Sequence, residues 1–267
     1  MKTQDSINAG VVIIVTASTL LQGIALLGLL PIAAGSIGRQ VFSSVEMLLV
    51  LLLLMQGWRI RQWSLASGQD VLVRKTATLC FFSLLLCTLG DFVNRNYFGQ
   101  YYQWDAVIKH SYLIEAIGFF FPGYFLVVLV NWQISRHRVS TRWMAGTVLL
   151  MLLAGTLAYG MNHDPRINAV SSALILLYTL LLSVLAGSTL WIIKTYGWAA
   201  SSLVVTGMLL APVADALIGN FWIYRDYFPV IEHVNWIIYF TSLAMIQQLP
   251  FFLARAKREN SDASRAA

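Results

Sequence analysis

The stretch TATLCFFSLLLCTLGDF, residues 76–92, runs for fifteen residues without a charge before it reaches Asp91. A second apolar run, residues 197–218, likewise carries Asp215 near its end. In both places an Asn follows five residues after the acid, at Asn96 and Asn220. About 20 mostly apolar residues are enough to span a bilayer as a helix. The two stretches therefore predict transmembrane helices that each end close to a carboxyl group.

The composition of the whole chain supports a membrane protein. Of the 267 residues, 58% are apolar and only 11% are charged, whereas a soluble domain has about 25% charged residues. We predict an all-α bundle of about eight transmembrane helices, forming a single domain over residues 1–254 and followed by a polar, disordered cytoplasmic tail over 255–267. The predicted spans are 8–34, 41–58, 76–92, 107–132, 143–161, 168–193, 197–218 and 230–253.

Lys and Arg are unevenly divided between the two sets of connecting segments. Thirteen of them lie on one side of the predicted bundle and five on the other. Because cytoplasmic segments carry an excess of basic residues, we predict that both termini are cytoplasmic. The segments that follow Asp91 and Asp215 then face outward. We expect a multi-pass protein of a bacterial inner (plasma) membrane, with these segments on the periplasmic side.

The two acidic helix ends are followed by similar tetrads. Val107-Ile108-Lys109-His110 comes after the first acid and Val230-Ile231-Glu232-His233 after the second. The acids are 124 residues apart, and the second copy is shifted from the first by four predicted helices. Because four is an even number, both copies cross the membrane in the same direction. This favours two parallel repeats of about 1–133 and 134–254, as some carriers have. The match is short, and chance similarity is the alternative.

The ionisable residues inside the predicted spans gather in the outward half of the bundle. Glu46 and Glu115 lie roughly 8 Å and 12 Å into their predicted helices at about 1.5 Å per residue. Ionisable groups at such positions avoid lipid and face the bundle interior or a wet cavity. We therefore predict one outward-opening polar cavity that includes Glu46, Asp91, His110, Glu115, Asp215 and His233.

Structural roles are the alternative for several of these residues. Asp91 and Arg95 have the i,i+4 spacing of a simple helix ion pair. Asn96 and Asn220 have the character of turn or cap residues. The aromatic residues after each acid are typical of the belt that transmembrane proteins place at the headgroup level.

The pattern resembles the lysoplasmalogenase family, eight-helix membrane proteins that hydrolyse the vinyl-ether bond of lysoplasmalogens. The matching features are Gly90-Asp91 at the end of the third helix, Asp215 at the end of the seventh, His110 at the start of the fourth, and the helix count. The resemblance implies a reaction that needs no metal or cofactor. It implies Asp91 and Asp215 as an acid and base pair, tuned by His110 or Glu115. We expect the substrate cavity around them to include Glu46, Asn96, Tyr112, Asn220, His233 and Tyr239.

Other functions stay open at this point. Acids and histidines in one wet cavity also suit a proton-coupled transporter, a sensor or an accessory membrane subunit. A haem or metal bound by His110 and His233 is a third alternative. No Gly-Xaa-Ser-Xaa-Gly elbow and no Walker loop occurs in the sequence. No basic run interleaves aromatic residues, so we expect membrane lipid, and not nucleic acid, as the partner.

Overall fold

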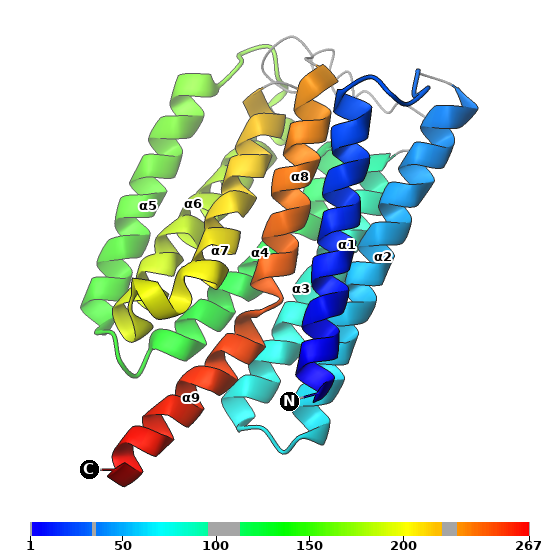
Figure 1. Cartoon of the computed structure of the whole chain (residues 1–267). Coiled ribbons are helices and arrows are strands. Elements are labelled where there is room, and N and C mark those ends of the chain that lie inside the picture. The colour runs from blue at the N-terminus through cyan, green and yellow to red at the C-terminus, as the bar shows by residue number, and fades with distance from the viewer. Residues whose placement is uncertain (1, 34–35, 96–112, 221–228, 267) are drawn as a thin grey trace.

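The computed structural model describes residues 2–33, 36–95, 113–220 and 229–266, and every regular element in these ranges is a helix (Figure 1). The helices are α1 (Lys2–Leu26), α2 (Ile37–Ala66), α3 (Val71–Arg95), α4 (Leu113–Ser135), α5 (Thr141–Asn162), α6 (Ala169–Tyr196), α7 (Trp198–Ile218), α8 (Pro229–Ile246) and α9 (Leu249–Ala266). Eight spans are long and apolar enough to cross a membrane, with α8 and the first part of α9 forming the last. The prediction of an eight-span, all-α membrane bundle is confirmed.

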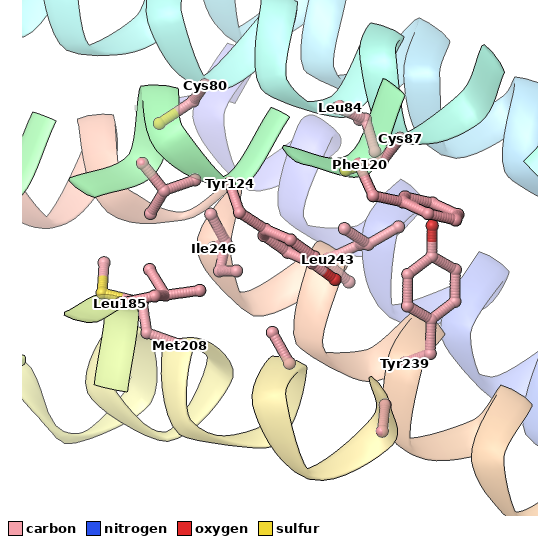
Figure 2. Close-up of a cluster of buried hydrophobic side chains, with 14 of the residues drawn as sticks. Cys80, Leu84, Cys87, Phe120, Tyr124, Leu185, Met208, Tyr239, Leu243 and Ile246 are labelled. Atoms are coloured by element: carbon pink, nitrogen blue, oxygen red, sulfur yellow. The ribbon is translucent and has the colours of Figure 1, made fainter. Parts of the chain in front are cut away.

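Helices α3 and α4 pack closely together, and so do α7 and α8, while α4 also packs against α6 (Figure 1). Gly207 allows the close approach of α7 to α8, because a Cβ there would lie 2.5 Å from the Cβ of Met245. The core formed between these helices is shown in Figure 2, where Tyr124, Leu185 and Met208 belong to one cluster of buried side chains. Helix α5 lies at the edge of the bundle and packs mainly on α6 (Figure 1).

The two ends of the bundle differ in what they carry. Both termini lie at one end, which we call the terminal end (Figure 1). The opposite end, called the distal end, holds the C-terminal ends of α3 and α7 with their aspartates and the N-terminal ends of α2 and α8. Whether the distal end faces outward stays a prediction, as do the bacterial inner membrane and the parallel repeats.

The last predicted span is broken near its middle. Helix α8 ends at Ile246, and α9 begins at Leu249 and turns away from α8 (Figure 1). Pro250 explains the break, because a proline has no N–H for the carbonyl four residues earlier and its ring clashes with that carbonyl. The carbonyl in question belongs to Ile246, the last residue of α8. The side chain of Gln247 at the break donates a hydrogen bond of 2.9 Å to the backbone oxygen of Cys80 on α3.

Several of the predicted boundaries were wrong. The tail predicted as disordered over 255–267 is helical as far as Ala266, which is consistent with its alanines and long charged residues being good helix formers. Helix α1 ends at Leu26 and not at residue 34, because Gly28 takes a left-handed φ of 72° as glycines after helix ends commonly do. Helix α2 begins at Ile37 after the cap Ser36, whose side chain accepts a bond from the Arg39 amide, and continues to Ala66.

Two polar contacts tie down segments between helices. Lys257 on α9 donates to Asp70, between α2 and α3, at 2.6 Å, and this hydrogen bond lowers the pKa of Asp70. Arg166 contacts both carboxylate oxygens of Asp164 between α5 and α6, and these bonds lower the pKa of Asp164 to about 2. Both aspartates lie outside the membrane-spanning segments.

Candidate functional site

Asp91 and Asp215 come from different halves of the chain but belong to one buried cluster. Asp91 lies one turn before the end of α3, and Asp215 lies in the last turn of α7. Each accepts a hydrogen bond from a tyrosine on another helix. Tyr239 on α8 donates to Asp91 at 2.9 Å, and Tyr178 on α6 donates to Asp215 at 3.1 Å. The two carboxyl groups are close enough to interact electrostatically.

A third tyrosine joins the pair. The hydroxyl of Tyr124 on α4 is fully buried and interacts electrostatically with both Asp215 and Asp91. It makes no hydrogen bond of standard geometry among the described residues. Its ring lies 6.4 Å from that of Tyr178, centroid to centroid. Two acids and three tyrosine hydroxyls thus interact with one another in this part of the bundle.

The glycine before Asp91 allows this arrangement. A Cβ at Gly90 would lie 2.9 Å from the ring of Phe120 on α4, so only glycine lets that ring pack directly on α3. Phe120 in turn meets Tyr239 edge-on, with ring centroids 6.1 Å apart. Figure 2 shows Phe120 and Tyr239 next to each other in the core, with Cys87 nearby. The Gly90-Asp91 pair therefore places an aromatic wall beside the tyrosine that donates to the acid.

A second polar cluster lies nearer the distal end and joins α1, α2, α3 and α8. Glu46 has no exposed surface; it accepts a 2.5 Å hydrogen bond from the amide of Gln22, and its other carboxylate oxygen lies 2.6 Å from Arg95. The Gln22 oxygen lies 2.7 Å from Nδ1 of His233. Because an amide oxygen can only accept, Nδ1 of His233 is the donor in this bond.

Arg95 and Glu232 connect this cluster to the surface. Glu232 forms an ion pair with Arg39 on α2 and lies 3.7 Å from Arg95. The guanidinium of Arg95 also stacks 4.3 Å from the ring centre of Trp236. Two arginines and two glutamates balance in charge, and Arg39 is the most exposed of them at 30%. Arg95 also interacts electrostatically with Asp91, so the two clusters adjoin.

One face of the acid pair opens onto a cavity of about 390 Å³. The cavity lies between α5, α6 and α7, and Asp215, Tyr178 and Asn220 line it. Asp215 is only half-buried because it meets this space, whereas Asp91 is 3% exposed and does not line the cavity. A ligand in the cavity would therefore touch Asp215, with Asp91 behind it.

The structure distributes the predicted site residues as follows. Asp91 and Tyr239 form one pair, and Glu46 and His233 share the distal cluster. Asn220 lies at the cavity, one residue past Gly219, and donates to the Ala216 carbonyl at 2.8 Å, as a turn residue would. The other predicted residues, Asn96, His110 and Tyr112, lie outside the described residues.

The depth expected for Glu46 was wrong. Because α2 begins at Ile37, Glu46 lies nine residues into it, which is about 14 Å at 1.5 Å per residue. Glu115 lies in the first described turn of α4, and its expected depth stays a prediction because residues 107–112 lie outside the described ranges. The i,i+4 spacing offered Asp91 as the ion-pair partner of Arg95. In the structure, the guanidinium of Arg95 instead bridges Glu46 and Glu232.

Sequence reasoning missed several members of the two clusters: Gln22, Arg39, Tyr124 and Tyr178. Gln22 had a usable signal, because an amide in the middle of an apolar span needs a partner in the bundle. Tyr124 and Tyr178 had no such signal, since tyrosines are common in membrane helices. One sequence also does not show which face of its helix each tyrosine lies on relative to the neighbouring helices.

No protein-family model, curated protein or solved structure matches the chain. In the described part of the chain, no group of three or more His, Cys, Asp and Glu side chains is arranged to hold a metal ion. The chemistry of the site thus has to be inferred from the acids, the tyrosines and the cavity.

Proposed function

We propose that this membrane protein hydrolyses the vinyl-ether bond of a single-chain, lysoplasmalogen-type lipid, using Asp91 and Asp215. Two observations carry the proposal together: Asp91 and Asp215, 124 residues apart in sequence, interact electrostatically, and Asp215 lines a cavity large enough for a lipid chain. The sequence resemblance to lysoplasmalogenases points to the same two residues.

The reaction can be written with the groups at hand. Asp215, which meets the cavity, donates a proton to the outer carbon of the vinyl group, and the remaining C–O unit becomes an oxocarbenium ion. Asp91, as a carboxylate behind it, stabilises this cation. Water then attacks the cationic carbon while Asp215 takes one of its protons back. The hemiacetal that results then breaks its C–O bond to the glycerol: Asp215 donates its proton to the leaving oxygen and takes the hydroxyl proton of the hemiacetal in return. A fatty aldehyde and a glycerol hydroxyl are released, and Asp215 is left protonated as at the start.

Aldehyde release by the purified protein tests the proposal. Lysoplasmalogen in lipid nanodiscs with the protein should yield fatty aldehyde, and Asp91→Asn and Asp215→Asn should each reduce the rate at least a hundredfold. Asp70→Asn is the matched control, because Asp70 is about half exposed and belongs to the terminal end. Unchanged turnover in both variants, or no aldehyde from the unmodified protein, would rule the hydrolase out.

A proton-coupled carrier is the second candidate. It is favoured by the polar path from the half-exposed Arg39 through Glu232, Arg95 and Glu46 towards Asp91, since such chains of ionisable groups mark ion pathways in membranes. Vesicles containing the protein would then accumulate a solute when a pH gradient is applied, and lysoplasmalogen would stay intact. Aldehyde release without any gradient-driven uptake excludes this candidate.

A further inference from the structure

The cavity between α5, α6 and α7 has a polar end and an apolar end. Tyr159, Asn162 and Asn220 line it at the distal end, and Met151, Leu182 and Ala186 line it deeper in the bundle. From Met151 to Asn162 the cavity follows α5 for eleven residues, roughly 16 Å. Asp215 lies between these ends, five residues and therefore roughly 7 Å below Asn220. This profile matches a lipid whose headgroup lies at the distal end and whose chain points towards the middle of the bilayer.

The cavity also reaches the surface that faces lipid. Ala154 and Ala158 on α5 and Ala216 on α7 line it, and all three remain exposed although they lie within membrane spans. Helices α5 and α7 each pack on α6, and the cavity lies between the two. Small side chains at these places leave the opening unobstructed. A chain can therefore move in sideways from the leaflet at the distal end.

The size of the cavity suits one chain and not two. Its volume of about 390 Å³ lies at the lower end of the range for ligand sites. If a methylene takes the ~30 Å³ that a water molecule takes in the liquid, there is room for about a dozen carbons. A second chain of the same length would have to stay outside.

A methionine closes the deep end. The side chain of Met151 packs against Gly187 on α6, where a Cβ would collide with it. Met151 thus lies across the floor of the cavity, next to Ala186. Shortening this side chain would open the space above Gly187 as far as Thr147, which also lies against this glycine one turn below Met151 on α5.

We propose that the cavity between α5, α6 and α7 binds the single aliphatic chain of a lipid from the leaflet at the distal end, and that Met151 sets the length of chain accepted. The inference rests on the shape and polarity of the cavity. It does not require the lipid to be cleaved.

The test uses 1-O-alkyl lysophosphatidylethanolamines, which lack the vinyl group, with chains from decyl to octadecyl and a diazirine at the chain end. In nanodiscs, photo-crosslinks should map to the peptides of α5 and α6 around Met151 and Ala186. Met151→Ala should prefer a longer chain than the unmodified protein does. Each methylene that the enlarged cavity newly buries should raise the affinity about fourfold. Ala158→Trp should reduce crosslinking at least tenfold.

Leu153 provides the matched control on α5, because it is 57% exposed and does not line the cavity. Leu153→Ala and Leu153→Trp should leave both chain preference and yield unchanged. A gain for longer chains cannot come from misfolding, so Met151→Ala is informative even if Ala158→Trp is unstable. Crosslinks on other helices, or an unchanged chain preference in Met151→Ala, would overturn the proposal.

The outcomes separate this inference from the hydrolase proposal. Crosslinks as expected without any aldehyde from lysoplasmalogen would remove the hydrolase and leave the chain site. Aldehyde release with crosslinks elsewhere would remove the chain site and leave the hydrolase.

Discussion

Removing Arg95 tests the polar cluster at the distal end directly. In Arg95→Met the buried carboxylate of Glu46 loses its partner at 2.6 Å but keeps the amide of Gln22. Methionine fills most of the arginine volume, so the main change is the lost charge. Glu46→Gln is the complementary variant, because the amide has the same shape and leaves Arg95 with Glu232 at 3.7 Å.

The magnitudes follow from burial. Breaking a buried ion pair by removing one partner is destabilising by about 3–5 kcal/mol, and Glu46 has no exposed surface. For a chain of this length 1 kcal/mol corresponds to about 2–4 °C in Tm, so Arg95→Met should lower Tm by roughly 10 °C. Glu46→Gln should lower it by less, since no buried charge is left alone. The double variant should be more stable than Arg95→Met.

Thermal unfolding in nanodiscs, followed by tryptophan fluorescence, provides the measurement. A cycle of the two single variants and the double variant gives the coupling free energy, which should exceed about 1 kcal/mol for residues in contact. Arg142→Met is the control, because Arg142 is exposed at the start of α5 and should change stability by less than about 0.5 kcal/mol. Additive losses in the cycle would show that Arg95 and Glu46 do not form the ion pair.

Three further expectations can be checked in the same preparations. Gly207→Ala should lower Tm by several degrees because its Cβ would collide with Met245 across the α7–α8 contact, while Gly146→Ala, with nothing within 4 Å, should be neutral or slightly stabilising; equal Tm values would contradict the close packing. Tyr239→Phe removes the donor to Asp91, and a loss of about 1–3 kcal/mol in the transition state would slow aldehyde release by about five- to 160-fold; a rate equal to that of the unmodified protein would remove Tyr239 from the site. The pKa of Asp70 is lowered in the fold, so its bond to Lys257 stabilises above about pH 4 and its contribution is lost as the pH falls through the lowered pKa. Since both groups are more than a third exposed, Asp70→Asn should lower the free energy of unfolding by less than about 1 kcal/mol at pH 7. It should have no effect at a pH below that lowered pKa. A loss of stability that persists at the low pH would contradict the stabilising role of the bond to Lys257.

The class of fold was readable because membrane spans are encoded locally. Length and apolarity alone define a span, and the eight predicted spans overlap the eight that the structure contains. The predicted helix boundaries were wrong where a single proline or glycine inside an apolar run interrupts the helical backbone. Pro250 lies inside a run that hydropathy treats as continuous, and the proline breaks it into α8 and α9. Gly28 similarly ends α1 eight residues before the apolar composition does.

The site was predictable in part for the same reason. A carboxyl in an apolar span stands out in a sequence, so Asp91, Asp215 and Glu46 were named as candidates, and their role in a site stays a prediction. Their partners depend on which faces of helices meet, and this is set by packing between segments far apart in the chain. Tyr178 could not be assigned to Asp215, 37 residues away on the next helix, without the rotation of both helices.

The bridge made by Gln22 has a consequence for how the chain is assembled in the membrane. One partner, Glu46, is inserted 24 residues after Gln22, but the other, His233, follows 211 residues after it. The amide of Gln22 therefore completes its hydrogen bonds only after the last span, which carries His233, has been inserted. We expect early insertion intermediates to keep α1 at a protein or water contact, and docking of α8 to close the ring of helices as the final, slowest step of biogenesis.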